Sequence, residues 1–355
     1  MSSIYTFYMN TNGKKTICLD AHRVEDLRHA AHILSCGGIV ALPTETVYGL
    51  AANGLSKEAI TKVFFAKNRP ITNPLILHVR DQERAMALFD ETLYRPRVKE
   101  RFDRLSRSFW PGPLTIICRK AAHIPNEAVG NLDTAAVRVA NHRAMRTILD
   151  LIDFPLAMPS ANLSSRPSPT SKEHVLRTLD GRIDAVVDGG PCVVGIESTV
   201  VKIDSDHVTL LRRGAIHKAM LSDALEEEVL EPIARDEEKP MSPGQAFLHY
   251  SPRVDSVQLI DKRQAADHWH GSCTIILQEN DFGKLNQVHG PRASDALSIV
   301  LPNEAKQFAQ ELYHALYKSE LLPDRKLVIV LPHHQSDEWL AILDRLTRAA
   351  TAATL

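Results

Sequence analysis

The sequence has few cysteines, and none of them form a paired motif. The five cysteines, Cys18, Cys36, Cys118, Cys192 and Cys273, are far apart and include no C-x-x-C sequence. This spacing argues against both a disulfide framework and a zinc cage. We therefore expect reduced thiols, most of them buried.

Long apolar runs and an excess of one charge are also lacking. No apolar run approaches the roughly 18 residues of a membrane span, and the polar segment 1–15 lacks the apolar stretch of a secretory signal. These absences predict a cytoplasmic protein with no membrane contact. The 42 Lys and Arg residues balance 43 Asp and Glu residues, so no overall field attracts nucleic acid or anionic lipid. Any site for a polyanion must be local.

Several common catalytic motifs are missing as well. The chain contains neither G-x-x-x-x-G-K-[ST] nor G-x-G-x-x-G, so the usual signals for a phosphate-binding or dinucleotide-binding loop are absent. It also lacks H-E-x-x-H, G-x-S-x-G and the zinc deaminase signature. An ATP site would need another design, and no metal-ligating residues are predicted.

What is present indicates two α/β domains and a connection. A chain of 355 residues exceeds what one core usually serves. Strands outnumber helices in residues 1–230, which predicts a twisted mixed sheet with helices packed on it. Residues 231–254 are rich in charge and proline and read as a linker. Residues 255–355 alternate strand and helix, which predicts a small domain with a parallel sheet.

Hydrophobic periodicity places the individual elements. Helices are expected at 24–36, 60–65, around 86, at 142–151 and 171–179, and in a stretch that ends near 230. Strands are expected at 39–42, 74–79, 114–118, 135–139, 155–158, 185–187, 198–203 and 208–211. In the small domain, strands are expected at 256–260, 273–277, 298–301 and 326–331, and a helix after each of the last two.

Four loop segments combine hydroxyl, cationic and small residues near predicted strand ends, where ligand sites of α/β folds collect. They are P-T-E-T-V-Y-G-L at 43–50, K-x-R-P-x-x-N-P-L at 67–75, P-S-A-N at 159–162 and E-S-T-V at 197–200. Each has an ordinary explanation, because hydroxyl-rich loops often make turns and helix caps. Together and in this order they indicate one site.

These segments resemble the YrdC-like threonylcarbamoyl-adenylate synthase family over residues 33–216. The turn at 242–244 and the sequence H-Y-S-P at 249–252 resemble the long form of that family. The resemblance implies a YrdC-like sheet and a small Rossmann-like C-terminal domain. It further implies a nucleotidyltransferase that joins L-threonine, bicarbonate and ATP into threonylcarbamoyl-AMP and pyrophosphate, which tRNA-modifying enzymes downstream would use.

The resemblance also carries site residues over to this chain. The threonine site would consist of Thr46, His78, Arg138, Met158 and Ser198. The ATP site would consist of Arg69, Asn73, Thr134, Ser160, Asn162, Ser168 and Arg212, with Lys67 and Arg69 as the catalytic cations. Mg²⁺ is expected together with ATP, since it bridges phosphates, but no carboxylate cage is visible and we assign no metal ligands.

Three points stay open from the sequence. Where the family reads R-P-G, this chain has Arg212 followed by Arg213, so either arginine could contact ATP. Neither Glu45 nor Glu197 is assigned as a general base, since each could equally anchor its loop. The linker carries Tyr250 next to other aromatic and cationic residues, and the long form implies that it covers the site as a lid, which would protect a labile acyl-adenylate.

Other functions compete with the synthase. A YrdC-like domain could bind RNA without turnover, although neutral net charge and 6% aromatic residues weaken this interpretation. A carbamoyl transferase of hydrogenase maturation would carry zinc-finger cysteines, which this chain lacks. An inactive relative would have lost the Lys67, Arg69, Ser160 and Asn162 set, which is intact here.

Overall fold

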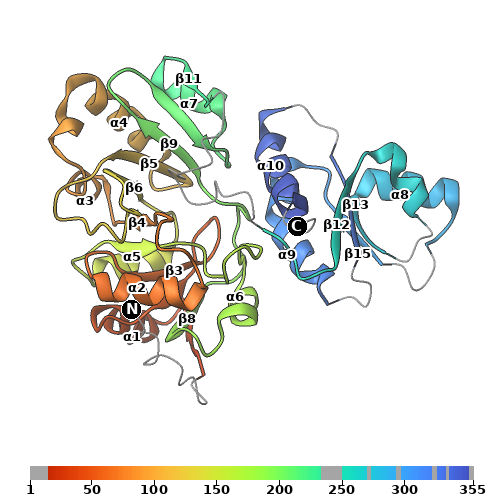
Figure 1. The fold of residues 1–355 in the computed structure, drawn as a ribbon, viewed down its shortest axis with the longest axis horizontal. Helices are drawn as coiled ribbons and strands as arrows, with labels where there is room; N and C mark the ends of the chain where they lie inside the picture. Colours follow the sequence, from red (N-terminus) through yellow and green to blue (C-terminus); the bar gives the residue numbers. More distant parts are fainter. Residues whose placement is uncertain are drawn as a thin grey trace.

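The chain forms two lobes, each built on its own β-sheet (Figure 1). The computed structural model describes residues 15–232, 250–269, 273–292, 297–321, 326–332 and 336–351. Most of the predicted linker, residues 233–249, lies outside the described residues. The first sheet uses strands up to Leu230, and the second begins at Ser256.

The larger lobe contains a mixed sheet in the order β1-β8-β2-β3-β7-β4-β6-β5-β9-β10-β11. Both parallel pairs, such as β4 with β6, and antiparallel pairs, such as β5 with β6, occur. The twisted mixed sheet expected from the sequence is confirmed. Its strands are β1 (Ile17–Asp20), β2 (Val40–Leu42), β3 (Gly49–Asn53), β4 (Ile76–His78), β5 (Leu114–Arg119), β6 (Thr134–Arg138), β7 (Leu156–Met158), β8 (Ala185–Asp188), β9 (Thr199–Ile203), β10 (Val208–Arg212) and β11 (Val229–Leu230).

Helices cover this sheet because each has an apolar side. In α1, the buried residues Leu27, Ala31 and Leu34 share one face at helical spacing. Ser56 and Ser171 cap the starts of α2 and α6 by accepting a backbone N–H. The helices are α1 (Val24–Ser35), α2 (Lys57–Lys67), α3 (Gln82–Met86), the 3-10 helix η2 (Glu91–Tyr94), α4 (Pro96–Phe109), α5 (Arg143–Asp150), α6 (Lys172–Leu179) and α7 (Lys218–Leu225).

The sequence predictions for this lobe need two kinds of correction. The helix expected to end near Leu230 ends at Leu225, because Glu226 is left-handed at φ 56°, and Val229–Leu230 pairs with β10 instead. Strands β1 and β3 and helix α4 were not predicted at all. Strand β3 reads Gly-Leu-Ala-Ala-Asn, whose residue types carry little strand preference.

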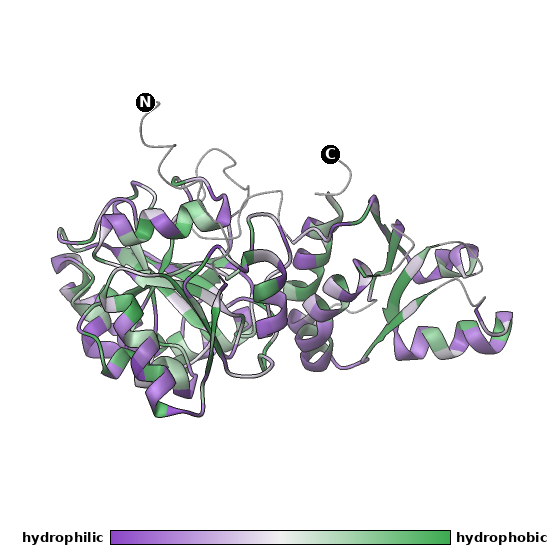
Figure 2. Ribbon diagram, turned by 90° about the horizontal axis from the view of Figure 1, so that it is seen from below, coloured by the Kyte–Doolittle hydropathy of each residue, from purple (hydrophilic) through white to green (hydrophobic). Residues whose placement is uncertain are grey.

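The smaller lobe has a parallel four-stranded sheet, as the sequence predicts, and its strand order is β12-β15-β13-β14. Helices α9 and α10 pack on one face, and η3 with α8 packs on the other. Figure 2 shows the apolar strands between helices whose outer sides are hydrophilic. The elements are β12 (Ser256–Ile260), η3 (Lys262–His268), β13 (Thr274–Gln278), α8 (Glu279–His289), β14 (Ser298–Leu301), α9 (Ala305–Ser319), β15 (Lys326–Val330) and α10 (Asp337–Thr351).

The two lobes are packed together through α9. Val47 and Ile196 of the first lobe belong to the apolar cluster formed by α9, α10 and the small sheet. Tyr317 of α9 donates to the carbonyl oxygen of Pro167 at 2.7 Å. Glu320, at the end of α9, forms ion pairs with Arg166 and Arg177 of the first lobe. The contact therefore combines apolar packing with buried polar bonds.

Gly195 lies where the backbone of α9 comes closest to the first lobe. An added Cβ at Gly195 would lie 2.3 Å from the Cα of Gln310 and 2.4 Å from the oxygen of Ala309. Gly190, in the same stretch of chain, has a similar positive φ but nothing within 4 Å of such a Cβ. Alanine substitutions at the two glycines therefore separate the cost of backbone strain from the cost of a steric clash with α9.

We expect Gly195→Ala to destabilise the protein more than Gly190→Ala does. The backbone strain common to both should cost about 1 to 2 kcal/mol, and overpacking at Gly195 should add about 1 to 3 kcal/mol. Denaturant unfolding of both variants beside the wild type measures the difference. Equal losses would show that the lobes are not packed closely at this position.

Candidate active site

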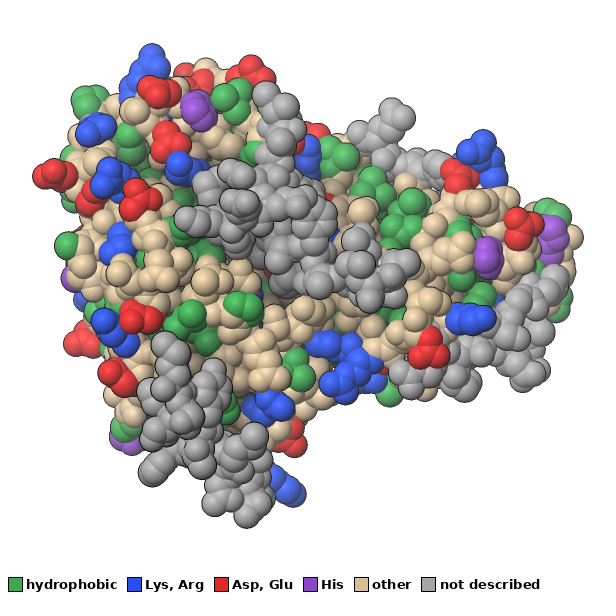
Figure 3. All heavy atoms as spheres, in the orientation of Figure 1, with side chains coloured by type: hydrophobic (Ala, Val, Ile, Leu, Met, Phe, Trp, Pro, Cys, Tyr) green, Lys and Arg blue, Asp and Glu red, His purple; other side chains and the backbone are tan. Residues whose placement is uncertain are grey.

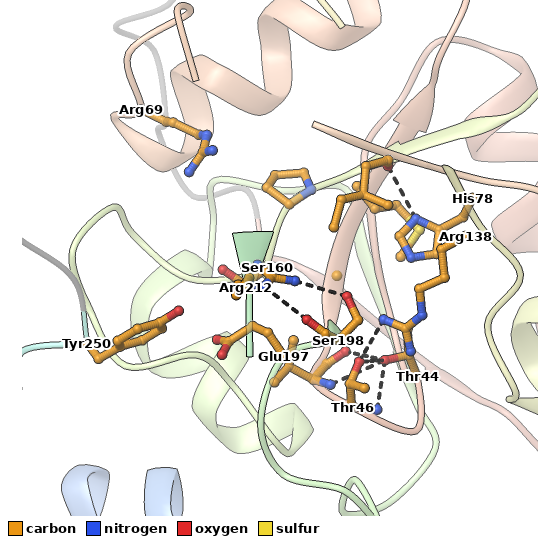
Figure 4. A pocket seen from close by; sticks show the side chains of 15 residues that line it. Thr44, Thr46, Arg69, His78, Arg138, Ser160, Glu197, Ser198, Arg212 and Tyr250 are labelled. Atoms are coloured by element: carbon orange, nitrogen blue, oxygen red, sulfur yellow. Dashed lines mark hydrogen bonds between the residues drawn. The ribbon is translucent and has the colours of Figure 1, made fainter. Parts of the chain in front are cut away.

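A pocket opens where loops of the large sheet meet Tyr250 (Figure 4). Thr46 comes from the β2–β3 loop, His78 and Arg138 end the neighbouring strands β4 and β6, and Met158 ends β7. The lining residues are Thr44, Thr46, Val47, Gly49, Arg69, Ile76, His78, Arg138, Met158, Pro159, Ser160, Glu197, Ser198, Arg212 and Tyr250.

The pocket brings together most of the residues expected from the sequence. All five residues that were expected to bind the substrate L-threonine line it, and so do Arg69, Ser160, Arg212 and Tyr250. Lys67, Asn73, Thr134, Asn162 and Ser168 are outside the lining. Of the two arginines left open, Arg212 lines the pocket, whereas Arg213 forms an ion pair with Glu231.

Arg138 is held in place from three sides. Its Nε donates to the oxygen of Gly112 at 3.1 Å and its Nη1 donates to Thr46 Oγ1 at 2.9 Å. Its Nη2 forms an ion pair with Glu45 Oε2 at 2.8 Å. Because the guanidinium is 4% exposed and fixed by these contacts, it offers a positioned cation at one end of the pocket.

His78 is a neutral side chain in this pocket. Burial, with the nearby charge of Arg138, lowers the pKa of His78 to about 3. Its Nδ1 lies 3.2 Å from the oxygen of Ile76, which can only accept, so Nδ1 carries the proton. The other ring nitrogen, Nε2, is then an acceptor for a ligand that donates a hydrogen bond.

Arg212 and Arg69 supply two further cations. Arg212 donates from Nε to the oxygen of Ser198 at 3.0 Å and from Nη2 to Ser198 Oγ at 2.9 Å. Arg69 Nη2 donates to the oxygen of Pro74 at 3.3 Å. Burial lowers the pKa of Arg69 to about 10, which still leaves it charged at neutral pH. With Arg138, three guanidiniums and one carboxylate line the pocket, which favours anions.

Lys67 acts on the pocket through a loop. Its ammonium, 1% exposed, donates to the carbonyl oxygen of Ser160 at 2.5 Å and also to that of Asn162. The side-chain nitrogen of Asn162 in turn donates to the oxygens of Leu163 at 2.8 Å and Arg166 at 2.9 Å. Both residues therefore shape the P-S-A-N loop, which presents Ser160 to the pocket.

Asn73 and Thr134 lie at the other ends of the strands that carry His78 and Arg138. Asn73 precedes β4 and Thr134 begins β6, and both are half-buried. Arg69, which lines the pocket, donates to the oxygen of Pro74, next to Asn73. A ligand as long as ATP would have to extend in this direction to meet them.

Of the two carboxylates that the sequence left unassigned, Glu197 lines the pocket and Glu45 does not. Ser168 donates to Glu197 Oε1 at 2.5 Å, which explains why Ser168 itself is outside the lining. Tyr313 and Arg345, from the smaller lobe, also donate to this carboxylate. Neither residue belongs to a motif, so the sequence held no signal for them.

Within the described residues there is no group of three or more His, Cys, Asp or Glu side chains that could hold a metal ion. The pocket carboxylate is already bonded to three side chains. The described part of the chain likewise has no helix that is long and apolar enough to cross a membrane.

Comparison with known proteins assigns the family. Residues 32–214 match the Sua5_yciO_yrdC family model, described as "Telomere recombination". Residues 216–351 match the model described as "Threonylcarbamoyl-AMP synthase, C-terminal domain". The chain belongs to the Sua5/YciO/YrdC family. The presence of the second match places it in the long form of the family.

Relatives and solved structures agree with this assignment. A threonylcarbamoyl-AMP synthase of Pyrococcus abyssi is 33% identical over 92% of this chain and 95% of its own length. One of Bacillus subtilis is 42% identical over 64% of each chain. The crystal structure of Pyrococcus abyssi Sua5 complexed with L-threonine has a TM-score of 0.84 at 29% identity, covering 96% of this chain and 98% of that one.

The buried neutral His78 makes a prediction about stability and pH. The unfolded chain takes up a proton at His78 as the pH falls through about 6.5, whereas the folded chain resists until about pH 3. Stability contributed by His78 is therefore lost as the pH falls through this window. Between pH 7 and pH 5, the wild type should lose about 2 kcal/mol more unfolding free energy than His78→Gln.

Denaturant unfolding of both proteins at the two pH values measures this difference. Other histidines, such as His174, are present in both proteins and cancel. Parallel loss of stability in the two proteins would show that His78 is accessible to protons in the folded state.

Proposed function

We propose that this chain is a threonylcarbamoyl-AMP synthase that uses L-threonine, bicarbonate and ATP. The threonine amine and bicarbonate combine to N-carboxy-threonine with loss of water. A carboxylate oxygen of this carbamate then attacks the α-phosphorus of ATP, and the bond from that phosphorus to pyrophosphate breaks. The observation that carries the proposal is a pocket with three guanidiniums beside hydroxyls and a neutral histidine, in a chain whose relatives bear this name.

Threonine fits the end of the pocket formed by Arg138, Thr46 and His78. The guanidinium of Arg138 complements a carboxylate, and the acceptor Nε2 of His78 complements a hydroxyl or amine. Met158, at the end of β7, and Ser198, directly before β9, complete this part of the lining. A neutral histidine keeps the site from attracting a second anion there.

ATP fits the end where Arg69 and Arg212 lie. Phosphoryl transfer requires positioning and neutralisation of charge more than a covalent nucleophile, and two buried guanidiniums supply both. Ser160 lines the same pocket, on the loop that Lys67 and Asn162 hold. Mg²⁺ enters as part of the substrate, bound to the phosphates of ATP, because the described residues offer it no cage of their own.

Tyr250 closes one side of the pocket. Tyr250 is 1% exposed and lines the pocket; it belongs to the predicted linker, of which residues 233–249 lie outside the described part. Water in the site would hydrolyse an acyl-adenylate, so a cover over the pocket protects the product until it is released. The product would pass to enzymes that transfer the threonylcarbamoyl group to tRNA.

An assay of product formation tests the proposal. The purified chain is incubated with MgATP, bicarbonate and labelled L-threonine, and each substrate is omitted in turn. We expect mass detection of threonylcarbamoyl-AMP and release of pyrophosphate only in the complete mixture. A folded chain that binds RNA in a steeply salt-dependent way but makes no product would instead support the RNA-binding module.

The surface of the chain gives little support to that alternative. On the face drawn in Figure 3, Lys and Arg side chains are interspersed with Asp and Glu over the parts that are described. Duplex and single-strand binders need a broad cationic face or stacking platforms. Weak RNA binding could accompany synthase activity, and the same salt titration would measure it.

Arg69 should be essential for turnover but not for folding. Its side chain lines the pocket and its recorded hydrogen bond goes to one backbone oxygen, so Arg69→Ala removes a cation from the ATP end while sparing the core. We expect turnover to fall at least about a hundredfold, with an unchanged circular dichroism spectrum. Arg213→Ala, outside the pocket, is the matched control, and equal activity of both variants would remove Arg69 from the ATP site.

A further inference from the structure

Two side chains of the smaller lobe reach the carboxylate that lines the pocket of the larger lobe. Arg345 of α10 is 1% exposed, and its Nε donates to Glu197 Oε2 at 3.1 Å. The hydroxyl of Tyr313, on α9, lies 3.1 Å from Oε1 and 2.9 Å from Oε2 of the same carboxylate. Neither Arg345 nor Tyr313 lines the pocket, so both act on it through Glu197.

The same two residues pack Tyr250 against the pocket. The guanidinium carbon of Arg345 lies 5.8 Å from the centre of the Tyr250 ring. The ring of Tyr313 lies 5.4 Å from it on a tilted plane. Arg345 is itself oriented by Asp344, which accepts from its Nη1 at 3.1 Å. One cluster from α9 and α10 therefore supports two residues of the pocket wall.

We propose that Arg345 and Tyr313 are positioning residues of the ATP end of the active site, which they complete by holding Glu197 as an oriented anion. The proposal deepens the synthase function and rests on it. It assigns the C-terminal lobe a part in shaping the active site, because a pocket without this lobe would keep Glu197 but lose two of the three side chains that donate hydrogen bonds to it.

The orientation of Glu197 decides what its neighbours can bind. An ionised carboxylate only accepts hydrogen bonds, so Ser168 must donate its proton to Glu197. The oxygen of Ser168 is then left as an acceptor. A protonated Glu197 could donate instead, and the direction of the hydrogen bond between Ser168 and Glu197 would no longer be fixed. Glu197 also directly precedes Ser198, to which Arg212 bonds.

The charge of Arg345 keeps Glu197 ionised at this buried position. Burial by itself would raise the pKa of Glu197, but the charges of Arg345 and Arg212 and the Ser168 hydrogen bond lower it to about 2. Among the influences that lower the pKa of Glu197, the charge of Arg345 is the strongest. Removing its charge therefore raises the pKa of Glu197.

The pH dependence involves every group that faces Glu197. These groups are Ser168 from the loop before α6, Tyr313 from α9, Arg345 and Asp344 from α10, Tyr250 from the predicted linker, and Arg212 from β10. Both tyrosines have pKa values raised by burial, so they stay neutral in the assay range. In the wild type, activity that depends on the Glu197 anion is lost only in strong acid. In a variant without the Arg345 charge, it is lost at a higher pH.

The test compares Arg345→Gln with Arg177→Gln in the full-length chain. Arg177 also forms an ion pair across the two lobes, with Glu320 at 3.3 Å, but it does not line the pocket. Steady-state kcat and KM for MgATP and for L-threonine are measured from pH 5 to 9. We expect Arg345→Gln to lower kcat/KM for MgATP roughly tenfold at pH 7 and kcat/KM for L-threonine by less. The acid limb of the pH profile, where activity falls at low pH, should move to higher pH.

Two more variants separate positioning from a general loss of structure. Arg345→Lys keeps the positive charge but changes the geometry of the hydrogen bond to Glu197. Its activity should therefore fall at nearly the same low pH as in the wild type. Tyr313→Phe keeps the ring and should lower kcat/KM for MgATP without moving the acid limb as far. The proposal is overturned if Arg345→Gln has the same kcat, KM and pH profile as Arg177→Gln, or if it lowers kcat/KM for L-threonine rather than for MgATP.

The result can be told apart from failure of the proposed function. If the wild type makes no threonylcarbamoyl-AMP, the synthase proposal fails whatever the variants do. Calorimetric titration of MgATP into the same four variants and the wild type then tests the positioning directly. Weaker binding by Arg345→Gln than by Arg177→Gln supports it, and equal binding contradicts it.

Discussion

The buried carboxylate of Glu197 is the point on which the two lobes and the pocket depend together. A carboxylate with 7% of its side chain exposed is costly unless it is paired and hydrogen-bonded. Here the larger lobe contributes Ser168 and the smaller lobe contributes Tyr313 and Arg345. The lobes must therefore be packed as they are for this anion to be stable. The same packing brings Tyr250 to the pocket and puts α9 against Gly195.

The rest of the site follows one electrostatic arrangement. Substrates that all carry anionic groups need cations, yet three guanidiniums in one pocket repel each other. Glu45 compensates Arg138, while Glu197 lies near Arg212 and is itself compensated from outside the pocket by Arg345. His78 stays neutral, so it adds a hydrogen-bond acceptor without a further charge. This arrangement positions charge for phosphoryl transfer, with no nucleophilic side chain required.

The sequence predicted those features of the fold and the pocket that depend on short local motifs. The segments 43–50, 67–75, 159–162 and 197–200 contain both the motifs that predicted the fold and most of the residues that line the pocket. Each of them follows or precedes a strand of the large sheet. Strand β3 escaped prediction because Gly, Ala and Asn do not favour strands, and only pairing with β2 and β7 makes it one. Lys67 was expected as a catalytic cation, but its contacts with two carbonyl oxygens depend on a loop about a hundred residues away in the sequence. The roles of Tyr313 and Arg345 depend on the packing between lobes, which no motif describes.

The central claim is that one pocket, closed by both lobes, binds L-threonine and ATP side by side. A crystal structure of the full-length chain with L-threonine and a non-hydrolysable ATP analogue tests it most directly. The account predicts the threonine carboxylate at Arg138, its hydroxyl or amine toward His78, and the α-phosphate between Arg69 and Arg212, with Glu197 still bonded to Arg345. Threonine or nucleotide bound outside this pocket, or a Glu197 released from Arg345 in the complex, would contradict it.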